Sequence, residues 1–322
     1  MRIVITGGTG LIGRELARKL AADGYEVVIL SRSPQKYRGM FGEHIRIAQW
    51  NGRSIGEWVK EIDGAEAVVN LAGESISGSN FIPDRWDTEK KRRIRESRVS
   101  VGRVLVEAVE TVEKRPQVFI QASAVGYYGS TADALITESS PPGDDFLATV
   151  AVDWEASTEP VEALGVRRVV ARIGIVLSTE EGALPRLLFP TRLFAGGWFG
   201  SGNQWWSWIH IADVVGAMKF LIENEPARGP VNLTAPKPVT NKEFGKALGR
   251  AMKRPSLIPV PAFALRIALG EVASTVLEGQ RVVPQRLLEM EYPFLYDEID
   301  EALNALLHEQ NGANSQKQLM PA

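Results

Sequence analysis

A glycine-rich segment, Thr6–Gly13 (TGGTGLIG), lies near the start of the chain between a strand-like run and a helix-like run. The preceding run, Arg2–Ile5, is apolar, and in the following run Leu16, Ala17 and Leu20 share one helical face. Glycines placed there let the backbone turn tightly and approach a pyrophosphate, which the free N–H groups of the helix attract. We interpret the segment as a dinucleotide-binding turn rather than a purely structural one, because the strand–turn–helix context is present. The predicted contacts within it are Thr6, Gly7, Gly10, Leu11, Ile12 and Gly13.

Strand-like and helix-like segments alternate through the first half of the chain, and continuous Val/Ile runs mark the strands. This alternation predicts an α/β fold of the Rossmann type, with a doubly wound parallel sheet covered on both faces. The segments are Arg2–Ile5, Gly13–Ala22, Glu26–Leu30, Ile55–Glu61, Ala67–Leu71, Arg92–Glu110, Val118–Gln121, Leu147–Ala163 and Arg168–Ile173.

The residues that would recognise the adenosine ribose follow the strand-like run Glu26–Leu30, about 20 residues beyond the glycines. An acidic residue there would accept a hydrogen bond from a free 2′-hydroxyl and repel a 2′-phosphate. This chain has Ser31 and Arg32 instead, and a hydroxyl and a guanidinium suit a phosphate. We therefore predict NADP(H) (NADPH when reduced) rather than NAD(H) as the cofactor. The alternative is a solvated arginine at a strand end.

A second wall of the cofactor site is predicted after the strand-like run Val68–Asn70, where the chain continues with small residues. In a doubly wound sheet the carboxyl ends of the strands form the ligand crevice. Leu71, Ala72 and Gly73 would let the cofactor lie close to the backbone there, although such residues also suit a plain tight turn.

The residue composition changes from about Pro185 onward: a segment rich in glycine and aromatic residues comes first, and short helix-like pieces separated by prolines follow. We expect a smaller, mainly helical C-terminal subdomain. The predicted division is an NADP-binding core of residues 1–175, to which 209–235 return, and a substrate-side subdomain of 176–208 and 236–308. Residues 309–322 are polar and aperiodic, which is typical of a disordered tail.

Composition excludes several classes of partner and chemistry. The formal net charge of the 322 residues is −2, which gives no field favouring nucleic acid or an anionic membrane. No apolar run has the length of a membrane span. The absence of cysteine excludes disulfides and thiol chemistry, and with three histidines a metal site is not expected. We expect a cytoplasmic protein that binds neither nucleic acid nor a membrane.

Ordered motifs recur along nearly the whole chain, starting with Thr6–Gly13 and Asn70–Glu74 (NLAGE). Further segments are Ser97–Val99, Ser123–Gly129, Phe146–Ala148, Trp154–Glu155, Gly182–Pro185, Gly202–His210, Pro236–Asn241 and Gly279–Pro284. Together they resemble the extended short-chain dehydrogenase/reductases, which include nucleotide-sugar epimerases and dehydratases. The chain is most similar to an atypical branch labelled epimerase family protein, or nucleoside-diphosphate-sugar epimerase. Some relatives in that branch carry the label cell-division inhibitor.

The resemblance implies a catalytic Ser and a Tyr-x-x-x-Lys pair, in which the Tyr is the general acid and base. Ser123 follows the strand-like run Val118–Gln121 and occupies the Ser position, with a turn cap as its alternative role. Anchoring the motif on Glu155 places Leu147 and Ala151 at the Tyr and Lys positions, and neither side chain can move a proton. The resemblance therefore implies cofactor binding without the standard proton relay.

Other side chains are candidates for the missing functions. Arg98 falls where the family has an Asn, and it would supply the positive charge that Lys normally provides. Tyr127 and Tyr128 follow Ser123 closely, and either could donate a proton above the nicotinamide. The alternative is that both tyrosines only wall the pocket.

Two substitutions concern the substrate. Epimerases of the ordinary type carry an Arg-Asp pair before the Ile-His segment, where this chain has Trp206 and Ser207. Gly174 replaces the usual Asn, so groups that hold a nucleotide diphosphate are missing at both positions. A nucleotide-sugar substrate is therefore not expected. His210 lies between two isoleucines and is interpreted as a structural histidine.

These observations predict an NADP(H)-binding oxidoreductase or epimerase-like enzyme that acts on an unidentified small molecule by nicotinamide hydride transfer. Ser123, with Tyr127 or Tyr128, would polarise the substrate oxygen. The alternative function is a non-catalytic NADP(H)-sensing regulator, which the cell-division label of some relatives permits. The resemblance also implies a homodimer.

Overall fold

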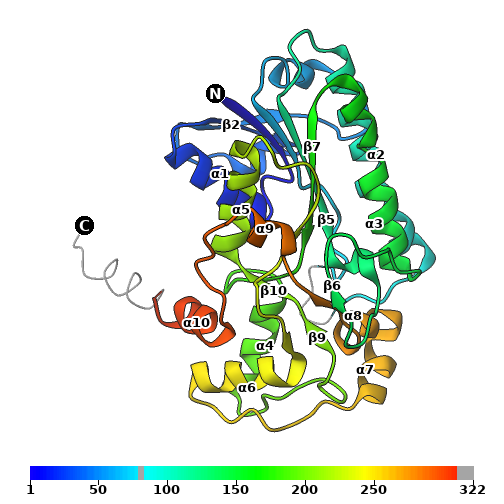
Figure 1. Cartoon of the computed structure of the whole chain (residues 1–322), viewed down its shortest axis with the longest axis vertical. Coiled ribbons are helices and arrows are strands. Elements are labelled where there is room, and N and C mark those ends of the chain that lie inside the picture. Colours follow the sequence, from blue (N-terminus) through cyan, green and yellow to red (C-terminus); the bar gives the residue numbers. More distant parts are fainter. Residues whose placement is uncertain (79–82, 310–322) are drawn as a thin grey trace.

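The computed structural model describes residues 1–78 and 83–309 and has a sheet of seven parallel strands at its centre (Figure 1). Strand β1, Arg2–Thr6, pairs with β2, Glu26–Ser31, on one side and with β4, Ala67–Asn70, on the other. The sheet therefore grows in both directions from β1, which gives the order β11-β7-β5-β4-β1-β2-β3. The other strands are β3 (Ile45–Gln49), β5 (Val118–Ala124), β7 (Arg167–Ile173) and β11 (Gly229–Leu233). This order confirms the predicted Rossmann-type fold class.

Four helices cover the two faces of the sheet: α1 (Leu11–Ala22), α2 (Thr88–Thr111), α3 (Phe146–Ala156) and α5 (Ile211–Glu223). Successive side chains of a strand point to opposite faces, so β1 contributes to two cores. Ile3 and Ile5 pack in the core that contains apolar residues of α1 and α5, whereas Val4 packs in the core that contains those of α2. Parallel strands buried on both faces explain the continuous Val/Ile runs of the sequence.

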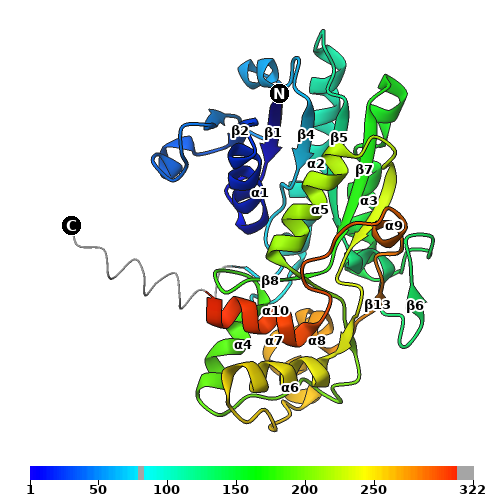
Figure 2. The same ribbon diagram turned by 60° about the vertical axis from the view of Figure 1, so that its left-hand side comes forward.

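A further group of helices lies beyond the carboxyl ends of the strands, below the sheet in Figures 1 and 2. Its own core includes the rings of Trp206, Trp208 and Phe244, all buried. The helices of this part are α4 (Ala183–Arg192), α6 (Asn241–Met252), α7 (Ala262–Leu269), α8 (Ser274–Leu277) and α10 (Ile299–Asn304). Helix α9 (Gln285–Glu289) lies beside the sheet, against β11, and its Leu287 is buried in a core of the sheet (Figure 2). Short strands pair as β8 (Ile175–Leu177) with β10 (Trp208–His210), β9 (Trp205–Trp206) with β12 (Val239–Thr240), and β6 (Leu135–Ile136) with β13 (Arg281–Val282).

The described residues include no helix that combines the length and the apolar character needed to cross a bilayer. Several element boundaries differ from those expected. The helix expected over 147–163 ends at Ala156, and Pro160 lies in a separate 3₁₀ turn, Glu159–Leu164. The helix expected over 55–61 is only a 3₁₀ turn, Glu57–Glu61, and β3 was not expected at all. Of the predicted disordered tail, residues 310–322 lie outside the described residues.

His210 is the N-cap of α5, where its Nδ1 atom accepts a hydrogen bond from the backbone N–H of Ala212. Burial of the imidazole lowers its pKa from 6.5 to about 4. Between these two values the unfolded chain binds a proton that the folded chain does not bind. The stability that His210 contributes is therefore present above pH 6.5 and is lost as the pH falls toward about 4.

We expect titration of His210 to lower the free energy of unfolding by about 3 kcal/mol between neutral pH and about pH 4. The variant His210→Asn keeps a cap acceptor but does not titrate, so its loss over this range is expected to be smaller by that amount. Urea denaturation of both proteins at the two pH values measures the difference. Equal losses in the two proteins would contradict a buried neutral imidazole.

Candidate cofactor and substrate site

The glycine turn between β1 and α1 can be built only from glycines at two positions. Gly7 has a φ of +67°, and a Cβ atom there would lie 2.5 Å from the carbonyl oxygen of Leu71. A Cβ atom on Gly13 would lie 2.5 Å from the carbonyl oxygen of Gly7. Gly10 is the N-cap of α1 and provides no side-chain cap, so the first N–H groups of this helix are left for a ligand.

A groove of about 930 Å³, here called the cofactor groove, lies at the carboxyl ends of β1, β2 and β4. This is the switch point of the sheet, where doubly wound folds bind their ligands. Its lining residues are Gly7, Thr9, Gly10, Leu30–Ser33, Lys36, Tyr37, Trp50–Arg53, Leu71–Glu74, Arg93, Glu96, Ser97, Ser100 and Val101.

Seven of the predicted cofactor residues line this groove, namely Gly7, Gly10, Ser31, Arg32, Leu71, Ala72 and Gly73. The other four, Thr6, Leu11, Ile12 and Gly13, are not among its lining residues. The hydroxyl of Thr6 donates to Asn70 Oδ1 at 2.7 Å, so this side chain joins β1 to β4 instead of facing the groove. Leu11 and Ile12 begin α1, and only their backbone N–H groups remain candidates for pyrophosphate contacts.

The end of the groove beside β2 carries a group of cations. Arg32, Lys36 and Arg53 are exposed there and form no ion pair within the described residues. Ser31 lines the same groove, and its hydroxyl accepts a hydrogen bond from the backbone N–H of Ser33 at 3.2 Å. Hydroxyl, ammonium and guanidinium groups around one point form a receptor for a dianionic phosphate. Neither Lys36 nor Arg53 was predicted from the sequence. Arg53 was missed because it follows β3, which was not recognised as a strand.

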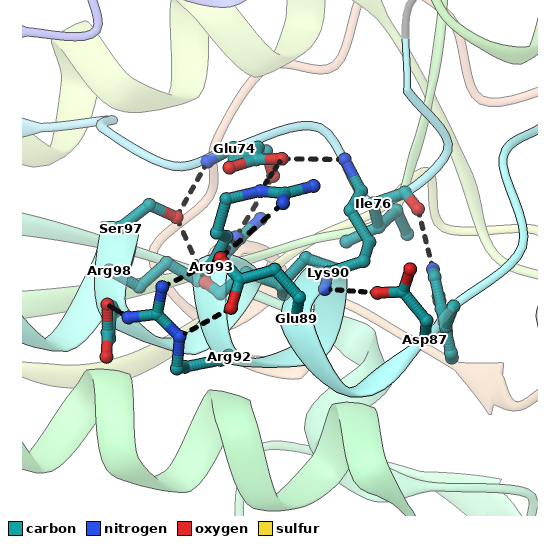
Figure 3. A network of polar contacts seen from close by, with 12 residues as sticks. Glu74, Ile76, Asp87, Glu89, Lys90, Arg92, Arg93, Ser97 and Arg98 are labelled. Atoms are coloured by element: carbon teal, nitrogen blue, oxygen red, sulfur yellow. Dashed lines mark hydrogen bonds and ion pairs between the residues drawn. The ribbon is translucent and has the colours of Figure 1, made fainter.

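The loop after β4 is held onto α2 by a polar network (Figure 3). The carboxylate of Glu74 accepts hydrogen bonds from Lys90 at 2.7 Å and Arg93 at 3.3 Å, and its backbone N–H donates to Ser97 Oγ at 2.9 Å. Arg98 donates to the carbonyl oxygens of Glu74 and Ile94 at 3.1 and 2.9 Å. The basic residues of α2 therefore position a wall of the cofactor groove.

Arg98 was predicted to supply a positive charge at the nicotinamide, and the structure places it elsewhere. Its guanidinium stacks on the ring of Trp154, 5.0 Å from the centroid, behind the Gly73 backbone. Desolvation lowers the pKa of this guanidinium to about 10. Arg98 lines neither the cofactor groove nor the second cavity described below, so its geometry fits a positioning role.

Ser123 and Tyr128 belong to a second, buried network. Ser123 Oγ donates to Glu155 Oε1 at 2.6 Å, and Arg172 binds both carboxylate oxygens of Glu155 at 2.9 Å. Arg172 also donates to the hydroxyl of Tyr128 at 3.0 Å, and that hydroxyl donates to Asn232 Oδ1 at 2.7 Å. Burial raises the pKa of Tyr128. Both hydroxyls are thus engaged inside the protein, and these residues line neither the cofactor groove nor the second cavity described below, so neither hydroxyl is placed as a proton donor in those two spaces.

Tyr127 is half-buried, and its hydroxyl has no hydrogen-bond partner within the described residues. Its ring stacks on Arg172, whose Cζ atom lies 3.5 Å from the ring centroid. Tyr127 also lines neither the cofactor groove nor that second cavity, so the structure brings none of the three predicted hydroxyl groups to these two spaces.

A second cavity of about 350 Å³, here called the aromatic cavity, lies at the carboxyl ends of β5 and β7. Ala124, not Ser123, faces it from β5, because neighbouring strand residues point in opposite directions. Leu147 also lines it, at the position where the family pattern has the tyrosine. The full set is Ile76, Trp86, Ala124–Gly126, Ser130, Asp145–Leu147, Ile173–Ile175, Trp205–Ser207, Glu271, Ser274, Thr275 and Glu278–Gln280.

The doubly wound sheet, the glycine turn and the groove at the switch point define a dinucleotide-binding protein of the Rossmann type. Comparisons with known proteins agree. Residues 3–233 match the NAD dependent epimerase/dehydratase family, and residues 260–306 match a domain of unknown function, DUF1731. The chain belongs to the NAD dependent epimerase/dehydratase family, and the resemblance to an atypical, epimerase-type branch of the short-chain dehydrogenase/reductases is confirmed.

Relatives extend over almost the whole chain. Epimerase family protein YfhF of Bacillus subtilis is 37% identical over 308 residues, which cover 95% of this chain and 98% of the relative. The chloroplastic SDR39U1 homolog of Arabidopsis thaliana is 40% identical over 313 residues, which cover 95% and 87%. The crystal structure of human epimerase family protein SDR39U1 (isoform 2) with NADPH is 34% identical, with a TM-score of 0.85, and the match covers 95% of this chain and 99% of the human one.

Proposed function

We propose that the chain binds NADPH in the cofactor groove and acts as an oxidoreductase or epimerase-like enzyme on a small molecule held in the aromatic cavity. The observation that supports this most strongly is that Arg32, Lys36 and Arg53, which are exposed and form no ion pair within the described residues, line the same groove as Ser31. They match the one group, the 2′-phosphate, that distinguishes NADPH from NADH. The NADPH in the human relative's crystal structure agrees with this cofactor.

The residues present fit the parts of this cofactor. The α1 N-terminus and the bare backbone at Gly7 and Gly10 suit a pyrophosphate, and Leu71–Gly73 form the opposite wall. Bound NADPH supplies a hydride, which is two electrons and one proton, so a carbonyl acceptor needs one further proton to become an alcohol. In this proposal Arg98 and the Glu155–Arg172 pair are positioning groups, which fix the loop after β4 and the end of β5.

The alternative is a regulator that binds NADP(H) without turnover. It is favoured by the burial of the Ser123 and Tyr128 hydroxyls and by the alkyl side chains of Ala124 and Leu147 in the aromatic cavity. A panel of aldehydes, ketones and quinones separates the two functions. Oxidation of NADPH by any of them supports the enzyme, and tight NADPH binding with no oxidation supports the regulator.

Arg32→Ala is expected to weaken NADPH binding by at least about tenfold, because a hydrogen bond to a charged group contributes about 1.5–3 kcal/mol. NADH has no 2′-phosphate, so its affinity is expected to change little. Arg38→Ala is a matched control, because Arg38 is also exposed but does not line the groove. Fluorescence titration of the native chain and the two variants with both reduced cofactors measures the six affinities, and native affinities that are equal for NADPH and NADH would overturn the assignment.

Other expectations stay predictions. They are a cytoplasmic location, a homodimer, the absence of nucleic-acid and membrane partners, and the division between a core of residues 1–175 with 209–235 and a substrate-side subdomain. Size-exclusion chromatography with light scattering tests the homodimer directly.

A further inference from the structure

We propose that the aromatic cavity binds a planar, uncharged aromatic carbonyl compound of the quinone type rather than a nucleoside-diphosphate sugar. This inference rests on the proposed function, because it names the substrate class for the same site. It follows from the walls of the cavity, from the charges around it and from the functional groups that it contains.

Part of the cavity wall is aromatic and apolar. Trp86 and Phe146 stand edge to face with ring centroids 5.3 Å apart, and Trp205 is a further aromatic residue of the lining. Leu147 and other aliphatic residues also line the cavity. Aromatic walls stack on flat rings, and about 350 Å³ is at the small end of the range for ligand sites. A fused pair of rings fits such a space better than a nucleotide joined to a sugar.

The charges around the cavity oppose an anionic ligand. Asp145, Glu271 and Glu278 line it, and no Lys, Arg or His among the described residues does so. Two cations lie behind the wall and already have partners in it: Lys91 forms an ion pair with Glu271 at 2.6 Å and lies over the ring of Phe146, and Arg281 lies over the ring of Trp205. A diphosphate would lose its hydration here without gaining a cationic partner, and a buried unpaired charge is strongly unfavourable.

The functional groups of the cavity restrict the acceptor further. No described Tyr, Lys or His lines it, and the side chains of Ala124 and Leu147 have no proton to donate. Reduction of a quinone adds one hydride and one proton and gives a hydroquinone. Its intermediate anion is a phenolate, and a phenol has a pKa of about 10, so water can supply the proton without a protein acid. A simple ketone would instead give a far more basic alkoxide, which needs such an acid.

Binding can be measured without turnover. The full chain, saturated with NADP⁺, is titrated by calorimetry with 1,4-naphthoquinone and separately with UDP-glucose. Naphthoquinone is expected to bind at micromolar concentrations, and UDP-glucose is expected to bind at least about 100-fold more weakly, which corresponds to about 2.7 kcal/mol. The chain has no cysteine, so thiol addition to the quinone cannot imitate binding.

Two variants, each with an alanine replaced by phenylalanine, test where the quinone binds. Ala124→Phe fills the cavity from an exposed position and is expected to weaken naphthoquinone binding at least tenfold while the affinity for NADPH is unchanged. Ala163→Phe is the matched control, because Ala163 is also exposed but precedes β7, at the opposite end of the strand from the cavity. The control is expected to bind both molecules like the native chain.

The outcomes separate the two proposals. Tighter binding of UDP-glucose than of naphthoquinone, or quinone binding that Ala124→Phe leaves unchanged, would overturn the substrate class. Neither result would affect the NADPH assignment, which depends on the cofactor titration alone. Conversely, a chain that binds naphthoquinone but not NADPH would refute the proposed function and leave the binding class of the cavity intact.

Discussion

Replacement of Gly7 by alanine is expected to reduce NADPH affinity by at least about 100-fold, which is about 2.7 kcal/mol of binding free energy. The new Cβ atom would lie 2.5 Å from the carbonyl oxygen of Leu71 and 3.0 Å from the backbone nitrogen of Ala72. Neither backbone atom can move alone, so the β1–α1 turn and the loop after β4 must separate. Both segments line the cofactor groove, and in the proposed binding mode the pyrophosphate lies against them.

Gly24→Ala is the control for Gly7→Ala. Gly24 also has a positive φ, +88°, but a Cβ atom there meets no atom within 4 Å. Both variants pay the cost of a left-handed alanine, roughly 1–2 kcal/mol of stability, but only Gly7→Ala deforms the groove. Titration with NADPH and thermal unfolding of both variants separate the two effects. Normal NADPH affinity in Gly7→Ala would mean that the cofactor does not lie against this turn.

The sequence was sufficient to predict the fold and part of the cofactor groove, because both depend on local patterns. The turn joins β1 to α1 within a few residues, and the buried strands appear as continuous apolar runs. Strand β3 was not predicted. It lies at the edge of the sheet and pairs only with β2, and its apolar run is too short to stand out in the sequence. Arg53 was missed with it, since its place in the groove depends on that strand.

The catalytic half of the site could not be predicted in the same way, because it depends on the direction of individual side chains. A shift of one residue along a strand reverses the face that a side chain meets. Ser123 therefore points to Glu155, while its neighbour Ala124 faces the aromatic cavity. The role of Arg172 was equally hidden, since its partners lie 17 and 44 residues away and meet only in the folded protein.

Breaking the Glu155–Arg172 ion pair by mutation is expected to cause a large loss of stability. Its side chains are only 13% and 5% exposed, and the guanidinium uses both oxygens of the carboxylate. Glu155→Ala leaves a buried, uncompensated guanidinium and removes the acceptor of Ser123. We expect a loss of roughly 3–5 kcal/mol in the free energy of unfolding, which is a large part of the stability of an ordinary domain.

Two further variants decide whether burial is the cause of that loss. Asp300→Ala breaks another two-bonded pair, with Arg250, but those side chains are 47% and 59% exposed, so its expected cost is at most about 1 kcal/mol. The double variant Glu155→Leu with Arg172→Met removes both buried charges and is expected to recover most of the lost stability. It also keeps the experiment decisive if Glu155→Ala does not fold. Urea denaturation measures all three, and a double variant no more stable than Glu155→Ala would show that the stability comes from the network's hydrogen bonds to Ser123 and Tyr128 rather than from charge compensation.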